Sequence, residues 1–199
     1  MTVILASQSP RRRELLATLG VEFQVASADI DESVRKNESA YDYVLRLAQQ
    51  KAQAVAEKIS NPDAVVIGSD TSVIFEAKIL GKPLDEADFS QMMNMLSGQS
   101  HQVMTAVAMV QGSHLISKVI STDVVFKTLS KDLIARYWQT GEPVDKAGGY
   151  GIQGFGSFLV DHIRGSYSAV VGLPLSETGQ MLVDCNIPIW NGTLNAKDL

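Results

Sequence analysis

The stretch from Ala64 to Phe75 reads AVVIGSDTSVIF, and GKP follows it at residues 81–83. Both ends of this stretch are apolar and β-branched, which is typical of a buried strand, whereas its middle is polar. A carboxylate inside a strand is strongly destabilised unless it is paired, coordinated or open to a ligand, so Asp70 needs a partner or a use. Gly68 has no Cβ and lets a ligand or another backbone approach. The alternative is a strand, a loop in which Asp70 caps a turn, and a second strand.

The composition is that of an ordinary globular protein. The chain has 199 residues, 45% of them hydrophobic and 20% charged, which is enough for one domain or one domain of two lobes. No apolar run reaches the length of a membrane span, and the start MTVIL lacks the basic flank and cleavage site of a signal peptide. We therefore expect a cytoplasmic protein that does not bind membranes.

Cysteine, histidine and charge exclude several classes of site. Cys185 is the only cysteine, so an internal disulfide is excluded, and the three histidines do not have the spacing of zinc ligands. A catalytic metal would therefore be a hard cation held by carboxylates. The net charge of −5 argues against broad nucleic-acid binding, so an anionic ligand has to meet a local cluster of positive charge.

The first strand, at residues 2–6, leads into SQSPRRRELLATLG at residues 7–20. Ser9 is a typical N-cap with Pro10 at the first helical position, and Gly20 ends the helix. The helix start, the hydroxyls of Ser7 and Ser9, and Arg11, Arg12 and Arg13 together form a candidate phosphate cradle. The alternative is a solvated arginine face, although cations are unfavourable in a first helical turn.

An acidic loop and a long helix come next. After a strand at residues 21–26, Asp29, Asp31 and Glu32 are close enough in sequence to repel one another unless a cation is near, which makes them candidate metal ligands. An exposed acidic loop is the alternative. Ser39 can cap a helix over residues 40–59, in which Lys51 lies at the edge of the apolar face and either reaches into a cleft or extends into water.

The elements that follow are expected to form scaffold, and most of their boundaries follow from apolar spacing and caps. They are helices over 86–96 and 131–139, strands over 101–110, 115–129 and 158–163, a turn at 165–168, a last helix ending near Cys185, and a polar tail from residue 188.

Glycine is dense in DKAGGYGIQGFG at residues 145–156. This density suggests a loop that wraps closely around a ligand, with Gln153 offering both a donor and an acceptor to a base edge. The pattern is neither a Rossmann fingerprint nor a Walker loop, and an ordinary flexible hairpin is the alternative.

Several motifs occur in a fixed order: SQSPRR, the acidic loop, GSDT, GKP, LSGQSHQVMTAV, DKAGGYGIQG and GSYSAVVGLPL. Together they resemble the Maf family of nucleoside triphosphate pyrophosphatases, and within it the branch that acts on dTTP and UTP, from Leu5 to about Ile187. The resemblance implies one α/β domain over 1–187, with a mixed twisted sheet, flanking helices and two lobes around a deep cleft, as in the inosine triphosphate pyrophosphatases. It also implies a homodimer, a divalent cation (Mg²⁺ or Mn²⁺), and hydrolysis of a nucleoside triphosphate to the monophosphate and pyrophosphate.

The branches of the family differ at three places, which read Arg11, Thr71 and Gln153 here. The branch that acts on 7-methyl-GTP typically has tryptophan, glutamine and glutamate there, so the resemblance favours the pyrimidine branch. Ser69 and Gly149 depart from that branch, which often has alanine at both places.

The resemblance makes Asp70 the expected general base, and we expect Asp70, Glu32 and Lys82 to act in catalysis, with Glu32 and Asp70 holding the metal. The residues expected to bind the substrate are Ser7, Ser9, Arg11, Arg12, Lys51 and Lys82 around the triphosphate and Thr71 and Gln153 at the pyrimidine. The alternatives are the same reaction on 7-methyl-GTP and a non-catalytic regulator of septum formation that binds nucleotides or nucleic acid. Two carboxylates beside a bound anion disfavour the regulator.

Overall fold

The computed structural model describes residues 1–59 and 61–191 and divides into two compact units. Unit 1 comprises Met1–Asp70, Thr105–Ile120 and Gly172–Leu199, and unit 2 comprises Thr71–Met104 and Ser121–Val171. Three long strands contribute residues to both units: β3 (Val65–Phe75), β5 (Ser100–Gln111) and β6 (His114–Phe126). The division along β3 falls directly after Asp70.

The described residues form one mixed sheet of seven strands in the order β2-β1-β3-β5-β6-β7, with β4 paired to β3. In unit 1, β1 (Val3–Ala6) is parallel both to β2 (Phe23–Ala26) and to β3. In unit 2, β4 (Lys78–Leu80) is antiparallel to β3, and β7 (Val160–Arg164) is antiparallel to β6. The predicted α/β fold with a mixed sheet and flanking helices is confirmed.

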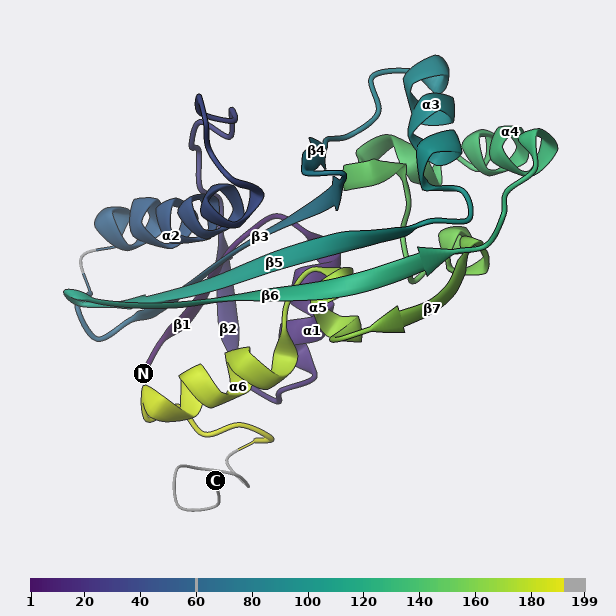
Figure 1. Cartoon of the computed structure of the whole chain (residues 1–199). Helices are drawn as coiled ribbons and strands as arrows, with labels where there is room; N and C mark the ends of the chain where they lie inside the picture. Colours follow the sequence, from purple (N-terminus) through teal and green to yellow (C-terminus); the bar gives the residue numbers. More distant parts are fainter. Residues whose placement is uncertain (60, 192–199) are drawn as a thin grey trace. The chain divides into compact units, whose positions relative to one another are not determined.

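The described part of unit 1 contains three helices: α1 (Pro10–Ala17), α2 (Ala40–Lys58) and α6 (Leu175–Asp184). Figure 1 shows α2 on one face of the strands of this unit and α6 on the opposite face. The apolar faces of α1 and α2 are buried, because Leu16 of α1 and Val44 and Leu47 of α2 are each fully inaccessible. Burial of these faces, rather than intrinsic propensity, stabilises helices of this length.

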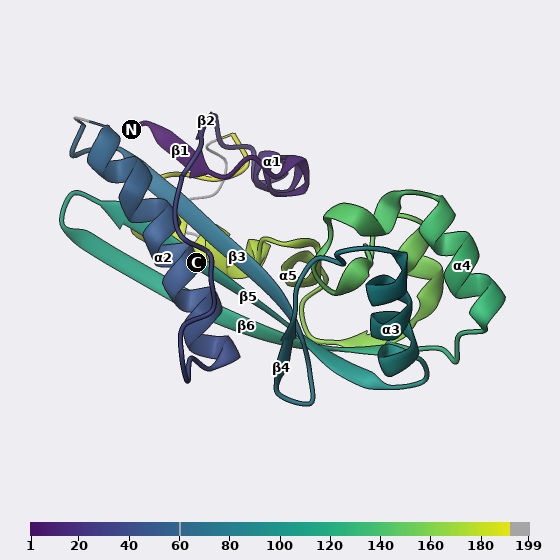
Figure 2. The ribbon, with the colours of Figure 1, turned by 90° about the horizontal axis from the view of Figure 1, so that it is seen from above.

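Unit 2 holds α3 (Glu86–Leu96), α4 (Lys131–Gln139) and the short α5 (Tyr167–Val171), with 3₁₀ turns over Glu142–Asp145, Ala147–Gly149 and Phe155–Leu159. Figure 2 shows α3 and α4 side by side. Phe89 of α3 lies 5.9 Å from the ring of Tyr137 and 5.1 Å from that of Trp138, both on α4. The buried face of α3 consists of Phe89, Met92, Met93 and Leu96.

Several boundaries differ from the sequence predictions, among them those of β6, β7 and the segment 165–168. Strand β6 ends at Phe126 rather than at 129, and the predicted strand from 158 starts at Val160. The predicted turn at 165–168 contains the start of α5 instead, because the Ser166 hydroxyl accepts the Ala169 N–H at 3.2 Å and so caps the helix.

The C-terminal segment is packed as far as the described residues reach. Ile189 is 6% exposed, the Trp190 N–H donates to the Leu19 carbonyl at 2.6 Å, and the Asn191 N–H donates to the Gly20 carbonyl at 3.1 Å. The predicted polar tail over 188–199 therefore begins with residues that are hydrogen-bonded to Leu19 and Gly20, just after α1. Residues 192–199 lie outside the described residues.

His101 is a buried histidine in the core of unit 2. It is 3% exposed, its Nε2 lies 2.6 Å from the Tyr150 hydroxyl, and the Phe126 ring packs edge-on at 4.9 Å. Its Nδ1 is buried without a hydrogen-bond partner. Burial lowers the pKa of His101 from 6.5 to about 4, so the ring is neutral at pH 7.

This histidine predicts a pH dependence of stability. Because the folded pKa is below the unfolded one, the unfolded state binds more protons between pH 6.5 and about pH 4, and the stability falls as the pH falls through that window. We expect the free energy of unfolding to drop by about 2 kcal/mol at pH 5 through His101 alone. Urea unfolding at several pH values, for the wild type and for His101→Gln, checks this; the glutamine keeps a polar partner for Tyr150. The free energy of unfolding of the variant should fall less between pH 6.5 and pH 4 than that of the wild type. An equal fall in both proteins would contradict the prediction.

Candidate active site

Asp70 lies in the middle of a continuous strand. Strand β3 runs from Val65 to Phe75 without a break, so the alternative of a strand, a loop and a second strand is wrong. Asp70 is 7% exposed, and its Oδ1 accepts a hydrogen bond from the Lys51 ammonium at 2.7 Å. The partner that a carboxylate inside a strand requires is therefore a lysine from α2.

Lys51 joins two carboxylates. Its Nζ lies 2.7 Å from Asp70 Oδ1 and 2.8 Å from Glu32 Oε1, and its side chain is 11% exposed. The alternative that Lys51 extends into water is therefore wrong. The Glu32 side chain is 57% exposed, so this carboxylate remains open to solvent or to a ligand while Asp70 is enclosed.

Burial dominates the electrostatics of Asp70. It raises the pKa of this carboxyl, Lys51 and Arg12 oppose the shift, Glu32 adds to it, and the net pKa lies above the ordinary value. A carboxylate of raised pKa holds a proton more readily than a solvent-exposed one does. The raised pKa makes Asp70 a candidate general base for water.

The loop between β1 and α1 has the predicted capped start. Ser9 is the N-cap and accepts the Arg12 N–H, and the Ser9 N–H donates to the Ser7 hydroxyl at 3.2 Å. The Arg12 side chain turns back over this loop, where its Nε donates to the Gly172 carbonyl at 2.8 Å and its Nη1 to Ser7 Oγ at 3.4 Å. For Arg12, the alternative of a solvated helix face is wrong. Arg11 is half-buried and Arg13 is exposed.

Ser69 and Arg12 meet at one carbonyl. Ser69 is fully buried, and its hydroxyl lies 2.8 Å from the Ala106 carbonyl and 3.0 Å from the Gly172 carbonyl. The Gly172 carbonyl thus contacts both side chains, one from β3 and one from α1. A buried hydroxyl needs such a partner, and it has one here, so serine is structurally accommodated at this position.

Two residues of α2 hold the acidic loop, and the sequence reasoning missed both. The Arg46 guanidinium contacts both oxygens of Glu38, at 2.5 and 2.8 Å, and donates to the Ser33 carbonyl at 3.0 Å. The Tyr43 hydroxyl donates to the Glu32 carbonyl at 2.8 Å. The hydrogen bond with Arg46 lowers the pKa of Glu38 to about 2. The signal in the sequence was spacing, because Tyr43 and Arg46 are three residues apart and therefore share one helical face.

The two carboxylates fit a magnesium-type site. Asp70 and Glu32 contact the same ammonium, so they lie close enough to share one cation. Residues 1–59 and 61–191 contain no group of three or more His, Cys, Asp or Glu side chains that could hold a metal. Mg²⁺ commonly takes one or two carboxylates and completes its octahedral shell with waters and substrate phosphate oxygens. Asp29 and Asp31, the other two candidate ligands of the acidic loop, are exposed.

The structure brings seven of the predicted site residues into unit 1: Ser7, Ser9, Arg11, Arg12, Glu32, Lys51 and Asp70. The other three belong to unit 2, where Thr71 is half-buried and both Lys82 and Gln153 are exposed. The glycine-rich segment around Gln153 does not form a hairpin, because 3₁₀ turns rather than paired strands stand on either side of it. Its glycines make room for side chains of unit 2 itself, as described below.

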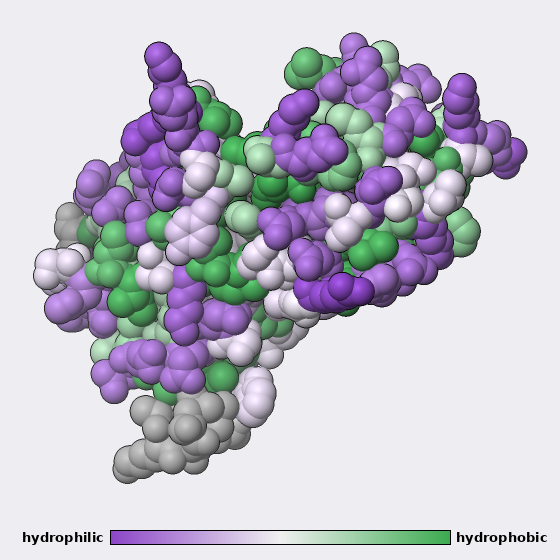
Figure 3. Space-filling view, in the orientation of Figure 1, coloured by the Kyte–Doolittle hydropathy of each residue, from purple (hydrophilic) through white to green (hydrophobic). Residues whose placement is uncertain are grey.

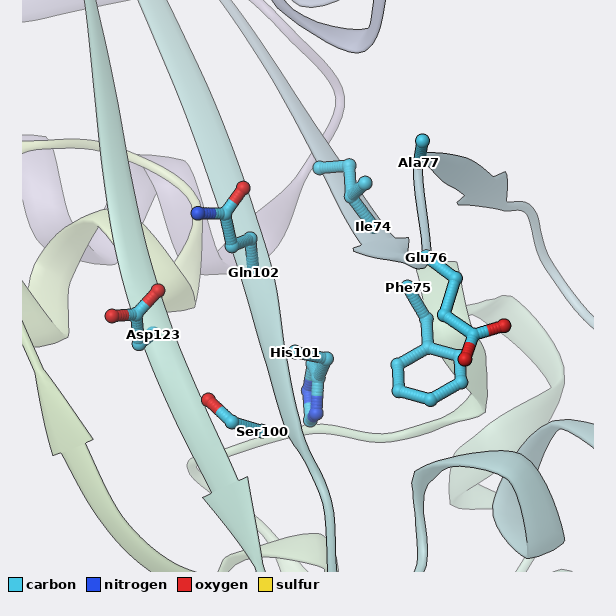
Figure 4. Close-up of a pocket in the computed structure, with 8 residues that line it drawn as sticks. All are labelled: Ile74, Phe75, Glu76, Ala77, Ser100, His101, Gln102 and Asp123. Carbon is cyan, nitrogen blue, oxygen red and sulfur yellow. The ribbon is translucent and has the colours of Figure 1, made fainter.

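A separate pocket of about 310 Å³ lies in unit 2. Figure 4 shows its lining, with Ile74, Glu76 and neighbours from the end of β3, His101 and Gln102 from β5, and Asp123 from β6. None of the predicted site residues lines this pocket. The candidate site is therefore defined not by this pocket but by Asp70 with Lys51, Glu32 and Arg12, which we call the Asp70 cluster.

The fold and the Asp70 cluster define an α/β protein with a buried carboxylate among cationic side chains. The family model described as Maf-like protein matches residues 2–185, and the chain belongs to this family. A dTTP/UTP pyrophosphatase of Colwellia psychrerythraea is 57% identical over 198 residues, 98% of this chain and 92% of that protein. One of Pseudoalteromonas translucida is 57% identical over 180 residues, 90% of this chain and 95% of that protein.

A solved structure of the Staphylococcus aureus Ham1 protein is also similar, with a TM-score of 0.45 and 17% identity over 80% of each chain.

Within residues 1–59 and 61–191, no helix is both long and apolar enough to cross a bilayer. Figure 3 shows hydrophilic side chains interspersed with hydrophobic ones over the visible face.

Proposed function

We propose that this protein hydrolyses dTTP and UTP to the nucleoside monophosphate and pyrophosphate. The observation that carries the proposal is the buried Asp70, which is paired with Lys51 and lies beside Glu32 and Arg12. The relatives named dTTP/UTP pyrophosphatase support the choice of substrate. A protein that only bound the nucleotide would gain nothing from two carboxylates next to the bound anion.

In the proposed reaction, Asp70 orients a water and accepts its proton as the water oxygen bonds to phosphorus. The bond between the α and β phosphates breaks, and pyrophosphate leaves with the electron pair. Arg12, Lys51 and the N–H groups at the start of α1 neutralise the triphosphate. The family resemblance adds Arg11 and Lys82 to this group, and Thr71 and Gln153 to recognition of the pyrimidine.

Asp70 and Glu32 are the proposed ligands of a divalent cation, Mg²⁺ or Mn²⁺. Such a cation would draw charge from the phosphate oxygens and hold them in place. Lys51 occupies the space between these carboxylates in the structure, so it would have to share them with the cation. A homodimer and a cytoplasmic location are further parts of the proposal, and they come from the resemblance and the sequence.

A panel of nucleotides tests the function. The protein is incubated with dTTP, UTP, CTP, GTP and 7-methyl-GTP, with and without Mg²⁺ or Mn²⁺, and pyrophosphate is separated from orthophosphate. We expect metal-dependent release of pyrophosphate, chiefly from dTTP and UTP. A preference for 7-methyl-GTP would retain the chemistry and reject the specificity, and tight binding without release from any nucleotide would reject catalysis.

A further inference from the structure

The Glu142 carboxylate lies at the centre of the loop formed by residues 151–156, which we call the Gln153 loop. Its Oε2 accepts the Phe155 N–H at 2.7 Å, and its Oε1 accepts the Gly156 N–H at 3.0 Å. The Tyr137 hydroxyl donates to the same Oε1 at 2.8 Å and accepts the Gly151 N–H at 3.1 Å. Both ends of the Gln153 loop are thus tied to one pair of side chains.

The glycines of the loop are required by this pair. A Cβ added at Gly154 would lie 2.0 Å from Glu142 Oε2, and one at Gly156 would lie 2.5 Å from the Tyr137 hydroxyl. Both separations are far below van der Waals contact. Two of the glycines that suggested a loop around a ligand, Gly154 and Gly156, therefore allow the close approach of Glu142 and Tyr137.

The charge of Glu142 suits this role. Partial burial opposes its ionisation, but the hydrogen bonds from Gly156, Tyr137 and Phe155 outweigh burial, and the pKa of the carboxyl lies below its usual value. The ionised group offers only acceptors to three donors, which is the strong, charge-assisted arrangement. An amide in its place would turn an NH₂ group toward at least one of these donors.

Gln153 sits between the two anchored ends. Gly151 is held by Tyr137 on one side, Phe155 and Gly156 are held by Glu142 on the other, and Gln153 itself is exposed. We propose that Glu142, together with Tyr137, is a positioning residue that fixes the Gln153 loop and thereby sets which base the enzyme accepts. This inference rests on the proposed function, in which Gln153 reads the pyrimidine.

The isosteric variant Glu142→Gln tests the role in selectivity. We expect the ratio of kcat/KM for UTP to that for CTP to fall roughly tenfold, because one misplaced hydrogen bond to a base changes discrimination by about that factor. Amide hydrogen exchange at Phe155 and Gly156 should become faster at the same time. The matched control is Glu57→Gln at the exposed end of α2, which should change neither quantity.

The outcomes separate the inference from the function. If the wild type releases pyrophosphate from UTP, and Glu142→Gln leaves either the selectivity ratio or the exchange rates unchanged, the inference is overturned. If the wild type hydrolyses none of the nucleotides, both the proposed function and the proposed role of Glu142 in selectivity are rejected. The exchange rates then still decide whether Glu142 anchors the loop.

A second variant addresses the same contact from the loop side. Gly154→Ala should loosen the loop in the wild type, because the new Cβ meets the Glu142 carboxylate. In a Glu142→Ala background the obstacle is gone, so adding Gly154→Ala should change the selectivity ratio by less than about twofold. Equal effects of Gly154→Ala in the two backgrounds would overturn the contact as the cause.

Discussion

Asp70→Asn is expected to lower the turnover number for dTTP by roughly 10³-fold while the chain stays folded. Asparagine has nearly the same shape as aspartate and can still accept the Lys51 hydrogen bond through its amide oxygen, but it cannot take a proton from water. Burial already raises the pKa of Asp70, which means that the charged form is disfavoured in the fold. Removing the charge should therefore leave the unfolding transition unchanged or move it to higher denaturant concentration.

Steady-state hydrolysis and urea unfolding measure the two halves of this prediction. Asp132→Asn is the matched control, since Asp132 is 72% exposed and pairs with Arg136 on the surface of α4. A variant at position 70 that keeps activity within tenfold of the wild type would remove Asp70 as the base. A variant whose activity returns at high Mn²⁺ concentration would instead assign Asp70 mainly to metal binding.

The sequence predicted Asp70 because the physical penalty for a charge inside a strand is local and can be recognised in a single stretch. The signal from Ser9 and Pro10 was equally local, because a helix start needs a capping side chain and a residue with a suitable φ. Ser9 does cap α1 in the structure. The position of Lys51 at the edge of an apolar helical face was enough to identify it as a candidate. Its contact with both Asp70 and Glu32 depends on how α2 packs, which no single stretch contains.

The residues that the sequence reasoning missed act over longer separations. Arg46 holds Glu38 and the Ser33 carbonyl, and Glu142 holds N–H groups thirteen and fourteen positions further along. Glu142 gives no signal of this role in the sequence, because its partners Phe155 and Gly156 bind it through backbone N–H groups, which any sequence offers. The glycine density around Gln153 did indicate a close approach, but glycine does not reveal what approaches.

Gly68→Ala should destabilise the fold and reduce activity together. An added Cβ would lie 2.2 Å from the Ala48 carbonyl oxygen and 2.7 Å from the Ala52 nitrogen, both in the backbone of α2. Because backbone atoms cannot rotate away, α2 has to shift from β3, and we expect a loss of about 3 kcal/mol in the free energy of unfolding. Lys51 lies in the same turn of α2, so its contact with Asp70 should lengthen and turnover should fall roughly 10²-fold.

Gly179→Ala in α6 is the control for the effect of a methyl group as such. Its Cβ would meet Ile189 and Leu19 at 3.6 Å, an ordinary contact, and alanine favours a helix over glycine by about 1 kcal/mol, so this variant should be slightly more stable. Urea unfolding of the two variants, together with KM and kcat for UTP, distinguishes two roles of Gly68: room for α2 and room for the substrate. Lost stability means that the missing side chain makes room for α2, whereas wild-type stability with a raised KM would mean that it makes room for the substrate.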